Sequence, residues 1–333
     1  MFGRGATERE GQAKRYKRVA LVKGDGIGPE VIESTLQVLE AVGAELELVP
    51  IELGYGRWKR TGHAMTSQDV DEAKECDCIL FGAITTPPDP NYKSVLLTLR
   101  KELELYANIR PIKGNDVNLI IVRENTEGMY SGIEELSYDK ATTLRVITRK
   151  GSQKIAEKAC QLTTPKKKLT IVHKSNVLKS DSLFLKVCRE TAERYGVHYE
   201  DMLVDAAAYN LVINPGRFDI LVTTNLFGDI LSDEAAGVIG GLGLCPSANL
   251  GDKYALFEPI HGSAPDIAGK GLANPVGAIL SAAMMLRWFG DEERAQEIEK
   301  TVGRAQEDGV KTPDMGGHYN TKEVTKFIVK LLG

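Results

Sequence analysis

Two aspartates have the spacing of a divalent-metal site. Asp229 and Asp233 are four residues apart in the segment 225–233, which puts both side chains on one face of a helix. Like charges in such positions destabilise a helix unless a cation joins them, and carboxylate oxygens suit Mg²⁺ or Mn²⁺. Asp205 is a further acid beside an apolar stretch. The alternative is an acid that only complements the helix dipole, which Asp229 alone could do.

Three arginines are candidates for binding the carboxylates of a substrate. Arg100, Arg110 and Arg123 each carry a planar guanidinium, which can hold a carboxylate through two parallel hydrogen bonds. We expect Arg110 and Arg123 at the ends of their elements, where sites form. For each arginine taken singly, a surface ion pair is the alternative.

Two loops that contain glycine could bind a phosphate-bearing ligand, and the 33 glycines in 333 residues exceed the usual ~7%. The loop 24–28 follows a strand pattern but lacks the third glycine of the dinucleotide fingerprint, so tight-turn geometry is its alternative. The loop 261–275 offers backbone N–H groups, an imidazole and a carboxylate, as nucleotide recognition needs; a surface-turn cluster is its alternative. We expect the cofactor in this second loop and close packing of the glycines in 237–243.

Strand and helix patterns alternate along the chain. The expected strands are 17–23, 45–51, 78–81, 119–122, 144–147, 169–172 and 220–223. The expected helices are 30–40, 67–74, 151–163, 180–195, 229–239, 275–288 and 291–306, the last with Asp291 as its N-cap. This order predicts an α/β fold with a mainly parallel sheet, and the length predicts two domains.

Composition excludes several classes of protein. The 42 basic and 46 acidic residues give a net charge of −4, and 42% of residues are hydrophobic, so neither a disordered chain nor a nucleic-acid partner is expected. Five scattered cysteines indicate reduced thiols. The longest apolar run, 278–286, is shorter than the ~20 residues of a membrane span. The polar segment 1–18 lacks the apolar region of a signal peptide and is interpreted as a tail; we predict a cytoplasmic protein.

Six blocks in register resemble the isocitrate/isopropylmalate/homoisocitrate dehydrogenase family, the β-decarboxylating dehydrogenases. The resemblance covers the chain from Val19 to about Gly317, and its most specific block is 225–244. The other blocks are 24–30, 105–111, 123–128, 173–178 and 258–266. The resemblance implies a two-domain isopropylmalate-dehydrogenase-like fold and a homodimer or dimer of dimers. Its large domain would comprise 1–105 and 240–333, and its small domain, 106–239, would carry the dimer contacts.

The resemblance also implies roles for the candidate residues. Asp229 and Asp233, with Asp205 from a second subunit, resemble ligands of Mg²⁺ or Mn²⁺. The three arginines match the groups that hold the malate carboxylates. Lys174, which also reaches across the dimer, matches the group that helps remove the hydroxyl proton. Tyr130 matches the acid that protonates the enol carbon after CO₂ has left.

NAD is the cofactor that the resemblance implies. Asp266 matches the acid that accepts the adenosine ribose hydroxyls in NAD-dependent members, and its carboxylate would repel the 2′-phosphate of NADP. NADP-dependent isocitrate dehydrogenases typically carry Lys and Tyr where this chain has Asp266 and Ile267. The expected NAD contacts are His261, Gly262, Ser263, Ala264, Asp266 and Asn274.

The segment 91–100 should determine the substrate specificity. Ser94 stands where isocitrate-type enzymes bond a γ-carboxylate, whereas Leu96 and Leu97 stand where isopropylmalate enzymes line an isopropyl pocket. The segment looks most like that of archaeal homoisocitrate dehydrogenases. It lacks the arginine that bacterial homoisocitrate enzymes often have at Leu97, so Lys93 is a hypothetical substitute.

The predicted reaction is NAD-dependent oxidative decarboxylation of a (2R,3S)-type 3-substituted malate. Homoisocitrate, giving 2-oxoadipate, is the first candidate, and longer homologues follow. The alternatives are 3-isopropylmalate, as in leucine synthesis, then isocitrate or D-malate. A non-catalytic regulatory subunit is the alternative outside this class.

Overall fold

The computed structural model describes residues 16–114 and 117–333 and separates them into two compact units, each described here by itself. The terminal unit contains the described residues up to Leu103 together with 240–248 and 253–333. The middle unit contains 104–239 and takes in the short piece 249–252. The sequence leaves open the role of the tail 1–16, of which residues 1–15 lie outside the described residues.

The terminal unit is built on parallel strands. Its strand order is β2-β1-β3-β12-β11, and β1 pairs in parallel with β2 and β3, as does β3 with β12. The strands are β1 (Lys17–Gly24), β2 (Leu46–Pro50), β3 (Cys78–Ala83), β11 (Pro246–Leu250) and β12 (Ala255–Pro259). The last two residues of β11 belong to the middle unit.

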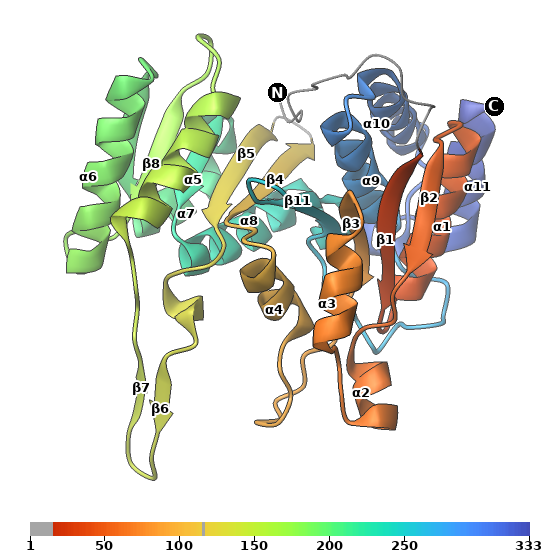
Figure 1. Ribbon diagram of the computed structural model, residues 1–333. Helices are drawn as coiled ribbons and strands as arrows, with labels where there is room; N and C mark the ends of the chain where they lie inside the picture. Colours follow the sequence, from red (N-terminus) through yellow and green to blue (C-terminus); the bar gives the residue numbers. More distant parts are fainter. Residues whose placement is uncertain (1–15, 115–116) are drawn as a thin grey trace, which may run out of the picture. The chain divides into compact units, whose positions relative to one another are not determined.

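Helices cover these strands and pack on one another, as Figure 1 shows for the orange and blue elements. Helix α1 contacts β1 and β3, α9 contacts β12 and β3, and α10 and α11 pack outside them. The helices are α1 (Gly28–Ala41), α2 (Tyr55–Thr61), α3 (Ser67–Lys74), α4 (Val95–Glu102), α9 (Val276–Trp288), α10 (Glu292–Glu307) and α11 (Thr321–Leu332). Asp291 caps α10 by accepting from the N–H of Arg294 at 3.2 Å, which confirms the predicted N-cap.

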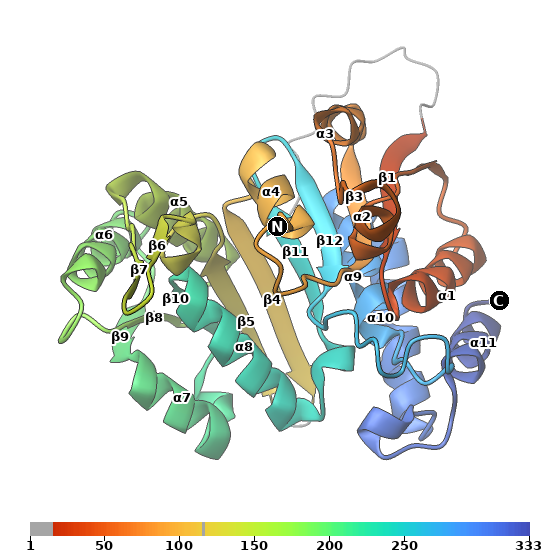
Figure 2. The same cartoon turned by 90° about the horizontal axis from the view of Figure 1, so that it is seen from below.

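The middle unit has its own sheet and two helical layers. Its strand order is β4-β5-β10-β8-β9, where only the β4–β5 pair is antiparallel. The strands are β4 (Ala107–Gly114), β5 (Val117–Glu124), β8 (Leu169–His173), β9 (Tyr199–Leu203) and β10 (Ile220–Thr223). The helices are α5 (Arg149–Leu162), α6 (Lys179–Arg194), α7 (Val204–Ile213) and α8 (Asn225–Ile239). Figure 2 shows the α5/α6 pair and the α7/α8 pair on opposite faces of the strands.

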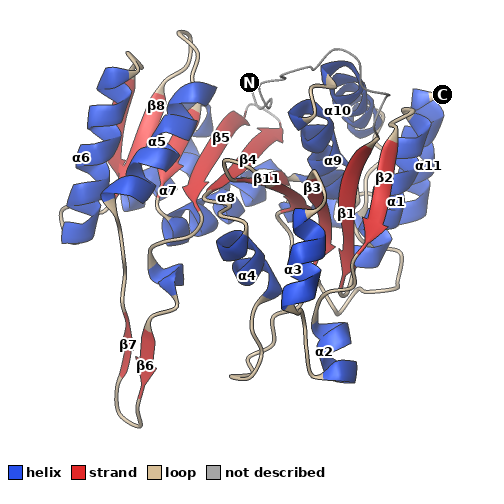
Figure 3. Ribbon diagram, in the orientation of Figure 1, coloured by secondary structure: helices blue, strands red, loops and turns tan. Residues whose placement is uncertain are grey.

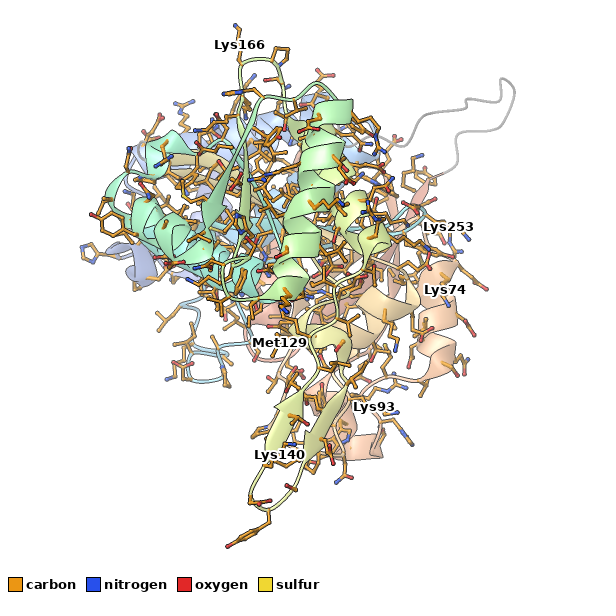
Figure 4. All side chains as sticks on the ribbon, turned by 90° about the vertical axis from the view of Figure 1, so that its left-hand side faces the viewer. Lys74, Lys93, Met129, Lys140, Lys166 and Lys253 are labelled. Carbon is orange, nitrogen blue, oxygen red and sulfur yellow. The ribbon has the colours of Figure 1, made fainter. Side chains whose placement is uncertain are left out.

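A two-stranded arm extends from the middle unit. Next to it, the prediction of a strand over 144–147 is wrong. The expected strand 144–147 contributes only a single bridge, between Val146 and Gly128. The strands nearby are β6 (Glu134–Leu136) and β7 (Ala141–Thr143), which pair with each other alone (Figure 3). Their side chains are all exposed, so burial gives no pattern to find. Figure 4 places Met129 near the root of the arm and Lys140 near its end.

The predicted fold class is confirmed, since both units are α/β and their strands are mostly parallel. All five cysteines are buried and none of them forms a disulfide, as expected for reduced thiols. Within the described residues, no helix combines the length and apolar character that crossing a bilayer needs.

Candidate active site

Asp229 on α8 lies at the centre of a charged cluster in the middle unit. Its Oδ1 accepts from Arg110 Nη1 at 3.2 Å and from Arg123 Nη1. Its Oδ2 accepts from the hydroxyl of Tyr130 at 2.9 Å. Arg110 Nη1 is also 3.6 Å from Asp233 Oδ1. The structure therefore brings together five predicted residues that the sequence places up to 123 positions apart.

Arg123 is fixed from several sides. It is 1% exposed, and its Nε and Nη2 donate to Asn225 Oδ1 at 3.1 and 2.7 Å. Its guanidinium lies 5.4 Å from the centre of the Tyr130 ring, in cation–π geometry. A Cβ on Gly228 would come within 2.7 Å of the Arg123 Cβ and Cγ. The glycine in α8 thus leaves room for the arginine.

Arg110 is held by amide and hydroxyl groups. Its Nε donates to Asn108 Oδ1 at 2.7 Å and its Nη1 to Ser232 Oγ at 2.6 Å. Asn108 in turn donates to Asn249 Oδ1 at 2.7 Å, which explains why 249–252 belongs to this unit. Arg110 lies inside β4 rather than at its end. Strand β4 pairs antiparallel with β5, and both strands contact α8, so Arg110 reaches α8 from within the strand. The expectation of an element end was wrong for this arginine.

Burial of the arginines excludes the surface ion pair as their role. Arg100 and Arg110 are each 5% exposed and Arg123 is 1% exposed. In the terminal unit, Arg100 Nη2 is 3.2 Å from Glu258 Oε1, with both side chains buried. A buried guanidinium needs a partner of opposite charge, and each of these arginines is paired with a carboxylate of the protein.

The acids on α8 have the oxygen ligands that a divalent cation needs. Burial raises the pKa of Asp233, against the opposing effect of Arg110 and with the help of the Asp229 charge. Two guanidinium groups already lie at Asp229, so a cation bound there would share this carboxylate with them. The donor set fits Mg²⁺ or Mn²⁺. Across the described residues, however, no three Asp, Glu, His or Cys side chains of this one chain form a metal-binding group, so Asp205 does not join the pair.

Lys174 and Asp205 form a second group in the middle unit. The Lys174 Nζ is 2.5 Å from Asp205 Oδ1, with side chains 26% and 63% exposed. The hydrogen bond from Lys174 lowers the pKa of Asp205. Parallel pairing of His173 with Leu203 aligns the ends of β8 and β9, which brings the following residues close together. The resemblance assigned both residues to a neighbouring subunit's site, and this stays a prediction.

The predicted substrate segment lies at the start of α4 in the terminal unit. Ser94 is the N-cap of this helix and accepts from the N–H of Leu97 at 3.4 Å. Leu97 itself is 39% exposed. The segment is anchored by Tyr92, whose ring stands edge-on to Trp58 at 5.7 Å between centroids. Ser94 thus has a structural task, and its predicted contact with substrate is additional.

The two glycine loops of the terminal unit lie against each other. The carbonyl of Ser263 accepts from the N–H of Ile27 at 2.9 Å, and the Ser263 hydroxyl is 2.7 Å from that of Thr85. A Cβ on Gly26 would lie 1.9 Å from the Ser263 oxygen. The loop 24–28 therefore needs glycine for tight turns and close contact, as its alternative interpretation held, and it supports the predicted cofactor loop.

Asp25 shows the same structural use of the first loop. Its carboxylate accepts from the backbone N–H groups of Tyr55, Gly56 and Thr85 at 2.8, 2.8 and 3.0 Å. These bonds fix the start of α2 and the residues that follow β3. The acid is saturated by backbone donors.

Within the predicted cofactor loop, polar groups differ in their accessibility. His261 Nδ1 is 2.9 Å from the carbonyl of Gly262, and burial lowers the pKa of His261. The backbone of Ala264 is left-handed, with φ of 36°, whereas the carboxylate of Asp266 is exposed.

Asn274 is buried, and the protein uses both ends of its amide. It donates to Asp314 Oδ2 at 3.1 Å and accepts from the N–H of Val276 at 3.1 Å. A Cβ on Gly243 would reach 2.7 Å from Asn274 Cβ. The expected close packing of 237–243 holds for this glycine but is wrong for the rest, because Gly240 and Gly241 have φ of 117° and 145° and Gly237 has open space around it.

Comparison with known proteins decides the family. A family model described as isocitrate/isopropylmalate dehydrogenase matches residues 18–328. The chain belongs to this family. Homoisocitrate dehydrogenase of Methanocaldococcus jannaschii is 46% identical over 339 residues, covering 95% of this chain and 97% of that protein. The 3-isopropylmalate/3-methylmalate dehydrogenase of the same organism is 46% identical over 331 residues, covering 94% and 98%.

A solved structure agrees with the fold. The crystal structure of isocitrate dehydrogenase from Methylococcus capsulatus matches with a TM-score of 0.92 and 42% identity, covering 95% of this chain and 99% of that one. This member of the isocitrate/isopropylmalate dehydrogenase family is therefore a β-decarboxylating dehydrogenase that acts on a small molecule. Such dehydrogenases generally use NAD(P) and a divalent metal. The predicted link to amino-acid biosynthesis fits the names of the relatives.

Proposed function

We propose that the protein oxidatively decarboxylates a (2R,3S)-type 3-substituted malate with NAD, and that homoisocitrate is its first substrate. Oxidation and loss of CO₂ would give 2-oxoadipate, and longer homologues would react in the same way. The observation that carries the proposal is the cluster at Asp229, where two buried arginines and the Tyr130 hydroxyl meet one carboxylate. Carboxylate-binding cations, a metal-binding acid and a proton donor are the groups that this reaction needs.

Each residue of the cluster has a separate task in the proposal. Asp229 and Asp233 would hold a divalent ion, which would supply polarisation of the substrate oxygen, and bound NAD would supply the hydride acceptor. Arg110 and Arg123 bind the malate carboxylates, and Arg100 contributes a third guanidinium. Their fixed positions mean that little order is lost when substrate binds.

Two proton transfers complete the scheme. Lys174 takes the proton from the substrate hydroxyl, and Tyr130 gives a proton to the enol carbon. We further propose that Lys174 and Asp205 serve the site of a second copy, as a homodimer or a dimer of dimers. The Lys174 Nζ lies 2.5 Å from Asp205 Oδ1, which supports the proposal that both residues serve the same site. The two units would then correspond to the family's large domain, 1–105 with 240–333, and its small domain, 106–239.

NAD rather than NADP is the proposed cofactor because of Asp266. Its exposed carboxylate would accept the ribose hydroxyls and repel a 2′-phosphate. The backbone from His261 to Ala264 would contact the remainder of the nucleotide. Asn274 would meet the adenine at its edge, since its amide is already bonded to Asp314 and Val276.

Homoisocitrate is preferred because Lys93 offers an exposed cation beside Ser94, and the substrate has a long acidic arm. The second candidate, 3-isopropylmalate, is favoured by the exposed apolar side chain of Leu97. Replacing Lys93 by Ala separates them. The homoisocitrate proposal requires a rise in KM for homoisocitrate alone, whereas equal behaviour toward both substrates would contradict the role of Lys93.

NADH formation tests the whole proposal. The purified protein is assayed with homoisocitrate, 3-isopropylmalate, isocitrate and D-malate, each with Mg²⁺, with EDTA, and with NADP in place of NAD. We expect the highest kcat/KM with homoisocitrate, NAD and metal. Failure of all four substrates would refute catalysis and favour a regulatory subunit. Preference for NADP would refute the role of Asp266.

A further inference from the structure

The turn that carries Lys174 is held by a buried acid that the proposed reaction does not use. Asp181 lies in the first turn of α6 and is 0% exposed. Its Oδ2 accepts from the backbone N–H of Lys174 at 2.7 Å. Its Oδ1 is 2.6 Å from Arg145 Nη2, an ion pair whose side chains are 0% and 13% exposed.

Arg145 extends this contact to the helix of Asp229. Its Nη1 donates to the hydroxyl of Ser180, next to Asp181, and its Nη2 donates to Thr224 Oγ1 at 3.1 Å. Its guanidinium also lies 5.5 Å from the centre of the Phe227 ring. Thr224 immediately precedes α8 and Phe227 lies in its first turn. One arginine therefore connects the Lys174 turn with the start of α8.

The backbone of Lys174 is fixed at both of its polar groups. Besides the bond from its N–H to Asp181, its carbonyl accepts from Val177 and Leu178 at 3.0 and 2.9 Å. Leu178 in turn accepts from the N–H of Asp181 at 3.0 Å, which closes the turn. With the backbone fixed, the side-chain torsions of Lys174 and its contact with Asp205 place the amine.

We propose that the Arg145–Asp181 pair is a positioning device that sets where the Lys174 amine lies relative to the substrate hydroxyl. This inference rests on the proposed function of Lys174. A buried ion pair is poor evidence of stability, because desolvation of both charges offsets their attraction. What the pair contributes is geometry, since the planar guanidinium contacts Ser180 and Asp181 of α6 and Thr224 before α8 at once, and a point charge could not.

Two conservative variants test the pair. Asp181→Asn keeps the shape and removes the charge, whereas Arg145→Lys keeps the charge and loses the planar fork. Arg149→Ala is the matched control, because it breaks an ion pair to α6 at 2.8 Å whose side chains are 54% and 47% exposed. Wild type and Lys174→Ala are measured beside them for kcat, for the KM of substrate and NAD, and for the urea midpoint of unfolding.

We expect both variants to lose kcat by roughly 10- to 100-fold, the loss that a displacement of about 1 Å produces, while the KM for NAD stays within about twofold. Arg149→Ala should match wild type. Folded variants with wild-type kcat, beside an inactive Lys174→Ala, would overturn the inference alone. Absence of turnover in wild type would overturn the proposed function and this inference with it. If NAD binding weakens or the urea midpoint of unfolding falls in parallel with kcat in both variants, the pair has a merely structural role and the inference is overturned.

Discussion

Replacing Gly228 by alanine should damage the site while improving the helix that carries it. Alanine in place of glycine inside a helix favours folding by about 1 kcal/mol. Here the added Cβ would lie 2.7 Å from the Cβ and Cγ of Arg123 and 3.2 Å from Thr223 Cγ2. Such overpacking costs about 1–3 kcal/mol, so the net change in the free energy of unfolding is roughly 0–2 kcal/mol toward instability.

The larger effect should fall on catalysis. Arg123 must move at its root, and its guanidinium then loses alignment with Asn225 and Asp229. A displacement of about 1 Å can lower the rate 100-fold, and the KM for the malate substrate should rise because a carboxylate partner has moved.

Gly237 in the same helix provides the control. A Cβ there would meet no atom within 4 Å, so Gly237→Ala should stabilise the protein by about 0.5–1 kcal/mol without changing kcat or KM. Urea unfolding and steady-state NADH formation are measured for both variants. A Gly228→Ala protein with wild-type kinetics would refute the reasoning, since the glycine would then have no relation to Arg123.

Three further predictions concern the cofactor, the proton donor and stability. Asp266→Lys should raise the ratio of kcat/KM for NADP to that for NAD by about tenfold or more, because each unit charge ~4 Å away contributes about 1 kcal/mol even in water; an unchanged ratio would contradict the role of Asp266. Tyr130→Phe should lower kcat about 10²- to 10⁴-fold while the urea midpoint falls only slightly, and full product formation by this variant would exclude Tyr130 as the acid. Burial acts to raise the pKa of Asp201, but hydrogen bonds from Arg189 and His173 outweigh it and lower the pKa. Asp201 therefore stabilises the fold above its ordinary pKa, so Asp201→Asn should cost about 0.5–1 kcal/mol at pH 7, and the difference from wild type should disappear as the pH falls through and below the range where the carboxylate is protonated.

Continuous or alternating apolar patterns predicted several strands, including the largely exposed β2, whereas the buried strands β11 and β12 were missed. Apolar runs such as 78–81 and 220–223 correspond to β3 and β10. β4 was missed because Asn108 and Arg110 interrupt its apolar pattern, although both are buried. A polar residue is read as exposed unless its partner is known, and these partners come from α8 and β11.

The same limit applies to the site. Charged residues at Asp229 and Asp233 could be found by type and spacing. Asn225, Ser232 and Asn108 were not singled out, because an amide or a hydroxyl signals no chemistry by itself. Their function is to fix the guanidinium groups, which becomes visible only when β4, β5 and α8 are packed together. The nearest sequence signal was that Asn225 begins the block 225–244, whose resemblance to the family is the most specific.

The middle unit divides the predicted residues into two groups. Arg110, Arg123 and Tyr130 lie around Asp229, whereas Lys174 lies beside Asp205. The proposed base is thus held on a turn after β8, separate from the proposed metal-binding acids of α8. That turn must then be positioned independently of those acids, yet in register with their helix. Arg145 meets both conditions, because it bonds Asp181 under Lys174 and Thr224 at the start of α8.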